Sequence, residues 1–399
     1  MNGNTISRLR KANNLSQSDF AIALKIDPQR LRKIENSKTT KIGYGQVRLA
    51  TAILGVNSID LSSDELPEHL PKLIDFRTSN NLPARITAAT LKYVHKAKKF
   101  QVALGNLFDD NPELKANRYF DRFSISDAPV DIAKNIRKSL ELSWNYQVSY
   151  DKTLDLYRFI RAQIELRGIS VCEESYPFED ARGFCLSSDG HNVPIVVINR
   201  TRSNRAVRSF TLLHELIHVL LRKQGISDFT KINNSVERYC NAVAANILMP
   251  QELFAKHAKQ YVSDKSISND DLRILSGEIG ASQYSTAIRL SELELVREGF
   301  VRRWLESLPK KSQKAISDGV LDPIFSEETT NQIRRGGRGT NKLARIGLLI
   351  ARCTVAAVRS GTRSELDIFR EFGIELEQLE ALSRPLNSRL REIEKIVQE

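Results

Sequence analysis

The chain has 399 residues, of which 41% are hydrophobic and 27% are charged, and its formal net charge at pH 7 is +12. A chain of this length exceeds one ordinary core, so we expect several domains. It has no run of about eighteen uncharged apolar residues and no hydrophobic leader after Met1, so we expect a cytoplasmic protein without a membrane span. The positive charge favours an acidic partner such as DNA, and the four widely spaced cysteines fit reduced thiols.

The first part of the chain is predicted to form a compact helical bundle. Four short helices are indicated, at Ile6 to Ala12, Ser16 to Leu24, Asp27 to Glu35 and Gln46 to Leu54. Ser16 and Asp27 are good N-caps, and Pro28 falls at the first helical position after Asp27. Apolar residues at helical spacing supply a core, namely Leu15, Phe20, Ala21, Leu24, Ile26, Leu31 and Ile34.

The helix at Asp27 to Glu35 would present polar side chains outward. They are Gln29, Arg30, Arg32 and Lys33. Such side chains hydrogen-bond base edges or phosphates in the major groove of DNA. The segment from Leu15 to Lys38, with Leu49 to Val56 after it, resembles the XRE-type helix-turn-helix domain of phage-repressor-like regulators. This resemblance implies DNA binding, with Gln17 on a phosphate.

The sequence departs from that family's pattern at two places. Lys25 stands where a glycine usually makes the turn, and it would adopt left-handed geometry at some cost. Asn36 and Ser37 replace another common glycine, although asparagine tolerates this geometry. These changes affect DNA affinity more than the fold, so a bundle that binds a protein instead of DNA is the alternative.

The middle of the chain begins with a predicted linker and continues as helix. Leu61 to Pro71 has a linker's composition, with serines, acidic residues and prolines. Residues 67–145 are predicted to be a helical connecting region, whose longest helix runs from Ile86 to Leu107. Its four lysines are interpreted as a solvated face, namely Lys92, Lys96, Lys98 and Lys99.

A small sheet is predicted next. A helix at Leu154 to Arg167 leads at Gly168 into three short strand-like runs, at Ile169 to Glu173, Gly183 to Leu186 and Pro194 to Asn199. Turn-forming residues separate these runs, which predicts an antiparallel arrangement. Val196 and Ile198 of the last run would pack the core, while a sheet edge beside a catalytic site could pair with an extended substrate.

A helix from Ala206 to about Lys223 carries the motif with the clearest chemistry, His214-Glu215-Leu216-Ile217-His218. Residues four apart share a helix face, so His214 and His218 can bind one zinc ion. Glu215 lies beside them, where a carboxylate can deprotonate a metal-bound water. Satisfied core histidines are the alternative, which the cost of burying unpaired imidazoles disfavours.

Catalytic zinc needs a third protein ligand and one open position. Glu237 is expected near the start of the following helix, which ends at Pro250, and it would supply that ligand. Asn241 lies one turn further, where it could bond the outer nitrogen of a liganding histidine. With zinc bound by these three residues, Glu215 would act as general base and then as general acid.

The two halves of this region resemble one family. The residues from Arg208 to His218, and then Glu237 through Asn241 to Leu248-Met249-Pro250, look like the ImmA/IrrE family of metallopeptidases. The resemblance implies a zinc endopeptidase. Several members of the family cleave a DNA-binding repressor and thereby switch on stress or mobile-element genes.

The rest of the chain is predicted to be helical. Asp271 to Ser276 and Ser282 to Leu293 have the outline of a second helix-turn-helix, more often a packing unit than a DNA reader. Arg334 to Gly339 could contact phosphate, but it is interpreted as a flexible basic linker. A helical tail of unknown purpose follows, at Lys342 to Arg359, Arg363 to Glu371 and Leu376 to the end. Its last eleven residues, from Arg389, suit an exposed helix or a homodimer contact.

Together these features predict a mostly α member of the α+β class. Residues 1–66 would be the helix-turn-helix domain, 67–145 the connecting region, 146–300 a zincin-like metallopeptidase domain with an antiparallel sheet, and 301–399 a C-terminal helical region. The predicted function is a DNA-associated zinc endopeptidase that cleaves a repressor or antitoxin-like protein. The alternative is a DNA-binding regulator whose zinc domain senses or stabilises without proteolysis.

Overall fold

The computed structural model of the chain describes residues 1–38, 41–67, 87–115, 120–149, 154–178, 180–188, 192–223, 234–310, 312–313 and 337–398. Within these ranges the protein is mostly helical with one three-stranded sheet, which confirms the predicted class. The chain divides into two compact units, Met1–Phe100 with Ser175–Ala181, and Gln101–Glu174 with Arg182–Glu399. The four-part division by sequence stays a prediction. Among the helices described, none has an apolar stretch that could span a bilayer.

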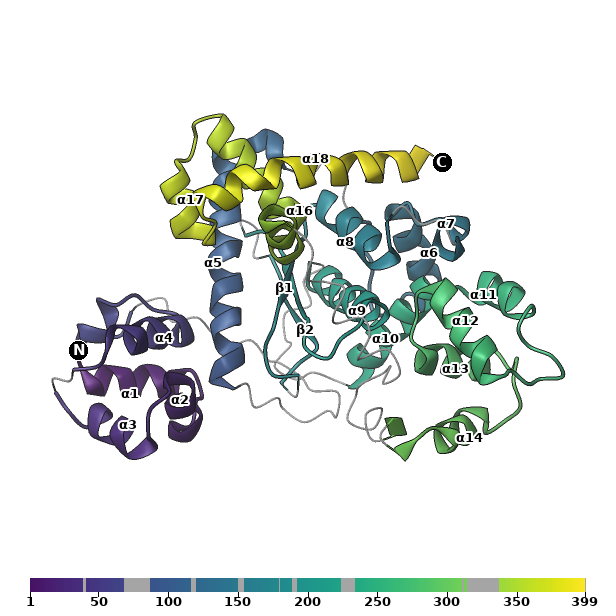
Figure 1. The fold of residues 1–399 in the computed structure, drawn as a ribbon, viewed down its shortest axis with the longest axis horizontal. Helices are drawn as coiled ribbons and strands as arrows, with labels where there is room; N and C mark the ends of the chain where they lie inside the picture. Colours follow the sequence, from purple (N-terminus) through teal and green to yellow (C-terminus); the bar gives the residue numbers. More distant parts are fainter. Residues whose placement is uncertain are drawn as a thin grey trace. The chain divides into compact units, whose positions relative to one another are not determined.

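The first unit begins with the four helices that the sequence predicts (Figure 1). They are α1 (Gly3–Ala12), α2 (Gln17–Leu24), α3 (Pro28–Glu35) and α4 (Tyr44–Leu54), followed by a 3-10 turn, η1 (Asp60–Ser62). The side chains of Ser16 and Asp27 accept the backbone N–H groups of Asp19 and Gln29, so both N-caps are confirmed. Lys25 ends α2 at φ 58°, the left-handed geometry that favours glycine.

The core of this bundle contains an ion pair besides its apolar residues. Arg10 Nε donates to Glu35 Oε1 at 2.6 Å, with both side chains buried. Ile26, expected in the core, is only half-buried because it follows the left-handed turn at Lys25. The predicted linker is wrong at its start: Leu61 is fully buried, and Thr5 Oγ1 donates to Ser63 O. Residues 68–71 of that linker lie outside the described residues.

Helix α5 (Ala88–Asp110) packs its first half into the same unit. The ring of His95 is buried there, with Nε2 3.2 Å from Asn13 Oδ1. The ring packs so closely on Gly55 that a Cβ at that glycine would come within 2.4 Å of His95 Nδ1. The predicted solvated lysine face is confirmed in part, because Lys99 is exposed while Lys92, Lys96 and Lys98 are half-buried. Ile86, where the predicted helix begins, and the rest of residues 68–86 of the predicted connecting region lie outside the described residues.

The second unit holds the sheet and the remaining helices (Figure 1). The strands are β1 (Ser170–Glu174), β2 (Gly183–Leu186) and β3 (Ile195–Asn199). The helices before and after them are α6 (Pro129–Ser139), α7 (Trp144–Val148), α8 (Leu156–Leu166), α9 (Arg205–Lys223), α10 (Asn234–Leu248), α11 (Gln251–Ala258), α12 (Asn269–Ile279), α13 (Gln283–Glu292), α14 (Phe300–Ser307), α16 (Arg338–Arg359), α17 (Glu365–Phe372) and α18 (Leu376–Gln398), with a 3-10 turn η2 (Pro112–Leu114).

The sheet is mixed, so the predicted antiparallel arrangement is half wrong. The strand order is β1-β3-β2, with β3 antiparallel to β2 but parallel to β1. Only eight residues separate β2 from β3, too few for the crossover that a parallel pair needs, whereas the longer path from β1 to β3 by way of β2 allows a parallel pair. As the central strand, β3 is buried along its whole length, so Val196 and Ile198 do pack the core.

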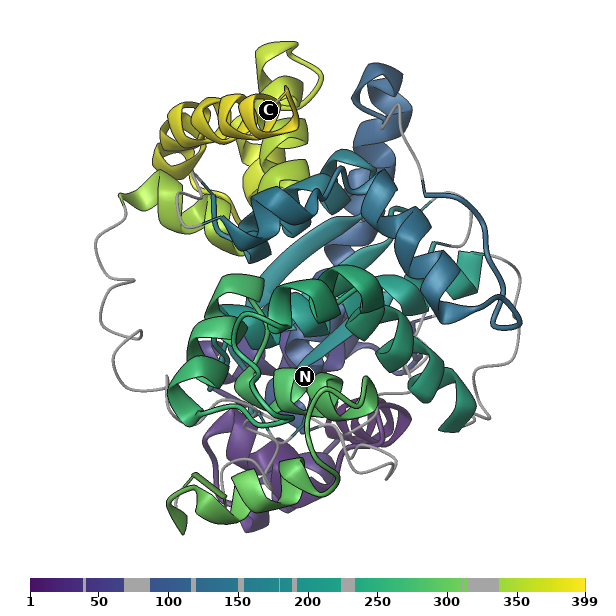
Figure 2. The same ribbon diagram turned by 90° about the vertical axis from the view of Figure 1, so that its right-hand side faces the viewer.

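Different helices cover the two edges of the sheet. Helix α9 packs on β2 and β3, and α10 packs on α9. At the other edge, α16 packs on β1 and α18 packs on α16. Figures 1 and 2 show the yellow C-terminal helices on one side of the strands and the green helices that follow α10 on the other.

The C-terminal helices are therefore an integral part of this unit. Gly337 is the N-cap of α16, and Gly339 lies so close to α18 that a Cβ would come within 2.0 Å of Ala381 O. The flexible linker predicted at Arg334 to Gly339 is thus wrong from Gly337 onward, because this close helix packing orders it. Residues 334–336 of that prediction lie outside the described residues.

Candidate metal centre

Helix α9 forms because its sequence has one apolar side and one polar side. Leu212, Leu213, Leu216 and Ile217 are fully buried. The opposite side of the same turns carries His214, Glu215 and His218, each half-buried. A helix with this pattern buries its apolar side against the sheet and leaves the polar side accessible to a ligand.

Helix α10 supplies the third candidate ligand from its first turn. Glu237 is half-buried there and faces α9. The other end of α10 is held by buried side chains: Arg137 Nη1 donates to Ile247 O at 2.7 Å, Gln147 Nε2 to Leu248 O at 2.8 Å, and Arg289 Nε to Met249 O at 3.1 Å. These donors satisfy carbonyls that a helix end leaves unpaired, and the positive charges of the two arginines suit the C-terminal end of the helix dipole. The placement of Glu237 therefore rests on an anchored helix.

The three candidate ligands meet at nearly equal separations. The Nε2 atoms of His214 and His218 are 3.1 Å apart. His214 Nε2 lies 3.2 Å from Glu237 Oε2, and His218 Nε2 lies 3.3 Å from Glu237 Oε1. Ligands of a tetrahedral zinc ion at about 2.0 to 2.1 Å are roughly 3.3 Å apart, so the donor set and its spacing fit zinc. Within the described residues, this is the one cluster of three such side chains that could hold a metal ion.

The charges at this site are strongly coupled. Burial acts to lower the pKa of His214, but the hydrogen bond to Glu237 and the charges of Glu215 and Glu237 outweigh it, so the pKa is raised. Burial acts to raise the pKa of Glu237, but the two histidines hold it well below its ordinary value. Metal ligands must be deprotonated, so a cation bound at this position would compete with protons for the imidazole nitrogens and the carboxylate.

Asn241, the predicted partner of the outer histidine nitrogen, is exposed on α10. A side-chain hydrogen bond to Asn241 contributes to the raised pKa of His214, after the larger effects of Glu237 and Glu215. His214 Nδ1, the outer nitrogen, is buried without a hydrogen-bond partner in the described part of the chain. Metal-bound histidines usually donate this N–H to an oxygen, so the role of Asn241 stays a prediction.

Strand β2 reaches the site at a glycine that the sequence reading missed. A Cβ on Gly183 would lie 2.8 Å from Thr211 Cγ2 and 3.4 Å from Glu215 Cγ. The strand therefore touches α9 at Glu215, and a side chain at position 183 would push the two apart. In the sequence, Gly183 is only a glycine at the start of a predicted strand. A glycine at such a position is equally typical of a turn.

Tyr239 follows Glu237 by two residues, and so lies on a different side of α10. Its hydroxyl donates to Ser124 O at 3.1 Å, and burial raises its pKa to about 12. Tyr239 therefore contacts Ser124 and not the three candidate ligands.

The residues predicted to contact DNA lie in the first unit. Gln29, Arg30, Arg32 and Lys33 are all exposed on α3. Gln17 is half-buried instead, and its Nε2 donates to Glu35 Oε2 at 2.8 Å, on the carboxylate that pairs with Arg10. Their contact with DNA stays a prediction.

Comparison with known proteins identifies one related family. Residues 164–291 match the Peptidase_M78 family model, described as the IrrE N-terminal-like domain. The matched residues include the sheet, α9, α10 and the helices as far as α13, which supports the resemblance to the ImmA/IrrE family for this part of the chain. Neither the curated proteins nor the solved structures yielded a significant match.

Proposed function

We propose that this chain is a zinc-dependent endopeptidase whose N-terminal bundle binds DNA. Its substrate would be a transcriptional repressor or an antitoxin-like protein, and cleavage would control stress or mobile-element genes. The observation that carries the enzymatic part is the set of three separations between 3.1 and 3.3 Å among His214, His218 and Glu237. The match of residues 164–291 to a peptidase family supports the same reading.

The residues of the site divide the chemistry between them. His214, His218 and Glu237 would hold zinc, which supplies Lewis acidity toward a peptide carbonyl and toward water. Glu215 lies beside these ligands on α9 and would accept the proton of the attacking water. It would then donate that proton to the leaving amine, a role typically worth about a hundred- to ten-thousand-fold in rate.

The DNA-binding part of the proposal rests on the first unit. Four polar side chains project from α3, two of them arginines, and none of the four is buried. Helix α3 follows α2 after a short turn with left-handed geometry at Lys25, which supports the resemblance to XRE-type domains. The charge of +12 favours a polyanionic partner.

A regulator with a structural or sensory zinc site is the second candidate. Glu215 beside the candidate ligands argues against this second function, because a structural zinc makes no use of such a carboxylate. A fourth protein ligand would favour it by closing the site, but the described residues offer three.

Metal analysis of the purified chain tests the proposal. We predict about one zinc per chain in the wild type and in Glu215→Gln, and loss of zinc when His214, His218 or Glu237 is replaced by alanine. His257→Ala is a matched control, because His257 pairs with Glu278 at 2.8 Å and belongs to no three-ligand cluster. Full zinc occupancy in His214→Ala would contradict the assignment.

A further inference from the structure

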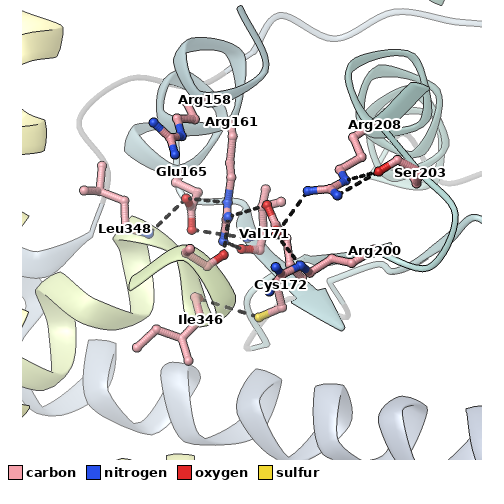
Figure 3. Close-up of polar contacts among 12 residues, drawn as sticks. Arg158, Arg161, Glu165, Val171, Cys172, Arg200, Ser203, Arg208, Ile346 and Leu348 are labelled. Carbon is pink, nitrogen blue, oxygen red and sulfur yellow. Dashed lines mark hydrogen bonds and ion pairs between the residues drawn. The ribbon is translucent and has the colours of Figure 1, made fainter. Parts of the chain in front are cut away.

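The second unit contains a buried array of charged side chains away from the metal ligands (Figure 3). Its central residue is Arg161 on α8, whose side chain is 8% exposed. Arg161 Nη1 donates to Glu173 Oε1 at 3.0 Å, and its Nε lies 3.4 Å from Glu165 Oε2. Arg161 thus joins two buried carboxylates that face different parts of the unit.

One carboxylate, Glu165, holds the C-terminal segment. Its oxygens accept the backbone N–H groups of Leu348 at 2.9 Å and Leu349 at 3.3 Å. These N–H groups are available because α16 is kinked at Gly347, at φ 87° and ψ 172°. A Cβ on Gly347 would come within 2.0 Å of Glu165 Oε1, so the kink and the carboxylate fit each other closely. Arg161 Nη1 also donates to Ala344 O at 2.6 Å.

The other carboxylate, Glu173 on β1, faces the beginning of the helix that carries the metal ligands. Its Oε2 lies 3.6 Å from Arg208 Nη1 and 3.4 Å from Arg200 Nε. Arg208 also donates to Ser203 O, from Nη2 at 2.7 Å and from Nε at 3.1 Å. In Figure 3, Leu348 and Glu165 lie at one end of the array, with Arg200 and Arg208 at the other.

The position of Arg208 is unfavourable without its partner. It lies in the first turn of α9, where the helix dipole repels a cation, and its side chain is only 10% exposed. The charge of Glu173 offsets both costs. A buried ionic array is weak evidence for stability, because apolar residues of similar size often stabilise a protein equally well. Its short polar contacts instead hold the groups that they join at defined positions.

We propose that Glu165, Arg161, Glu173 and Arg208 form a positioning array that couples the kinked helix α16 to the metal helix α9. His214 follows Arg208 by six residues, or about 9 Å along the helix. A small rotation or shift of the start of α9 therefore moves both imidazoles. Metal sites tolerate ligand displacements of about 0.5 Å, so undocking of α16 lowers the affinity for zinc. This inference rests on the proposed zinc site.

The test measures the Zn²⁺ dissociation constant by competition with a chromophoric chelator, with folding checked by circular dichroism. At the α16 end, Gly347→Ala should weaken zinc binding about tenfold, within the usual range of coupling between sites. Gly361→Ala is its matched control, because Gly361 has a similar positive φ of 74° but no atom within 4 Å of an added Cβ. At the α9 end, Arg208→Gln should have the same effect as Gly347→Ala. Arg200→Gln removes a cation from the same carboxylate oxygen outside α9, and should change the constant less than about twofold.

The double variant Gly347→Ala with Arg208→Gln decides whether the two ends are coupled. We predict that it binds zinc no more weakly than the weaker single variant, because either change already disconnects α16 from α9. Unchanged affinity in the folded single variants would overturn the proposal, as would a double-variant effect equal to the product of the two. If Gly347→Ala does not fold, Glu165→Gln takes its place with the same expectations. If the wild type binds no zinc, the proposed function fails, and this inference fails with it.

Discussion

At the scale of single residues, the candidate metal site includes a close approach at a glycine. Gly183 lets β2 touch α9 beside Glu215, and its nearest neighbours leave no room for a Cβ: Thr211 Cγ2 would lie at 2.8 Å and Val197 O at 3.1 Å. Overpacking a close contact of this kind typically costs about 1 to 3 kcal/mol.

We therefore predict that Gly183→Ala lowers the free energy of unfolding by about 1 to 3 kcal/mol. Thr211→Ser removes the methyl group and keeps the hydroxyl that donates to Val207 O at 3.0 Å. Adding Thr211→Ser to Gly183→Ala should restore part of the loss, although Thr211→Ser alone should not stabilise the protein. Denaturant unfolding of the four proteins measures this. Equal losses with and without Thr211→Ser would show that the Thr211 methyl is not the obstacle.

Residue spacing predicted part of this site and could not predict the rest. His214 and His218 are four residues apart on one helix, so their shared face follows from the helical repeat alone. The approach of Gly183 and the position of Asn241 relative to His214 depend on how β2 and α10 pack on α9. No local pattern encodes such contacts between distant segments.

At the scale of elements, α3 is the helix whose exposed side chains carry the DNA-binding proposal. If Arg30 and Arg32 contact phosphates, replacing both by alanine should weaken binding to a fragment with the chain's own promoter. The slope of log affinity against log salt should become shallower by roughly 0.9 for each lost contact. Arg8→Ala with Lys11→Ala is a matched control, because it removes two exposed charges from α1. If the two double variants weaken DNA binding equally, the loss reflects only the removal of positive charge. The exposed side chains of α3 would then be assigned to contact with a protein partner instead of DNA.

The contact of α5 with the bundle is predicted to depend on pH. Burial, with a smaller effect of Lys98, lowers the pKa of His95 to about 4. The unfolded chain would bind a proton near the ordinary pKa of about 6.5, so the stabilisation is complete above pH 6.5 and is lost as pH falls toward 4. The loss is on the order of 3 kcal/mol.

His95→Gln isolates this effect from the titration of carboxylates. The difference in unfolding free energy between wild type and His95→Gln should favour the wild type more at pH 7 than at pH 4.5. Denaturant unfolding at the two pH values provides the comparison. A difference that does not change with pH would mean that His95 is not buried as a neutral imidazole.

Prediction of the elements succeeded for the helices and for the antiparallel pair of β2 and β3, but failed for the direction of β1 relative to β3. Ser16, Asp27 and Pro28 are local signals, and the structure places α2 and α3 where they indicate. The parallel pairing of β1 with β3 comes from a chain path in which β2 is placed outside β3. That path cannot be inferred from the composition of the strands or from the turn residues between them.

At the scale of the whole molecule, the C-terminal helices are part of the unit that contains the sheet. The sequence indicated a separate helical tail of unknown purpose, whereas α16 covers an edge of the sheet and α18 packs on α16. The signal was not local, because Glu165 and Gly347 are 182 residues apart and meet only in the folded unit. The candidate metal ligands and the C-terminal helices consequently belong to the same compact unit.

In the proposed function, the chain hydrolyses a peptide bond at a zinc site with Glu215 as the general base. The most direct test compares protein N-termini in cells that produce the wild type or Glu215→Gln. The variant keeps all three ligands, so it should bind zinc and DNA as the wild type does. The account predicts that at least one repressor or antitoxin-like protein acquires a new N-terminus only with the wild type, and that it accumulates uncut, with its target genes silent, with Glu215→Gln. Identical N-termini and identical transcription in both strains would contradict it and leave the DNA-binding regulator in its place.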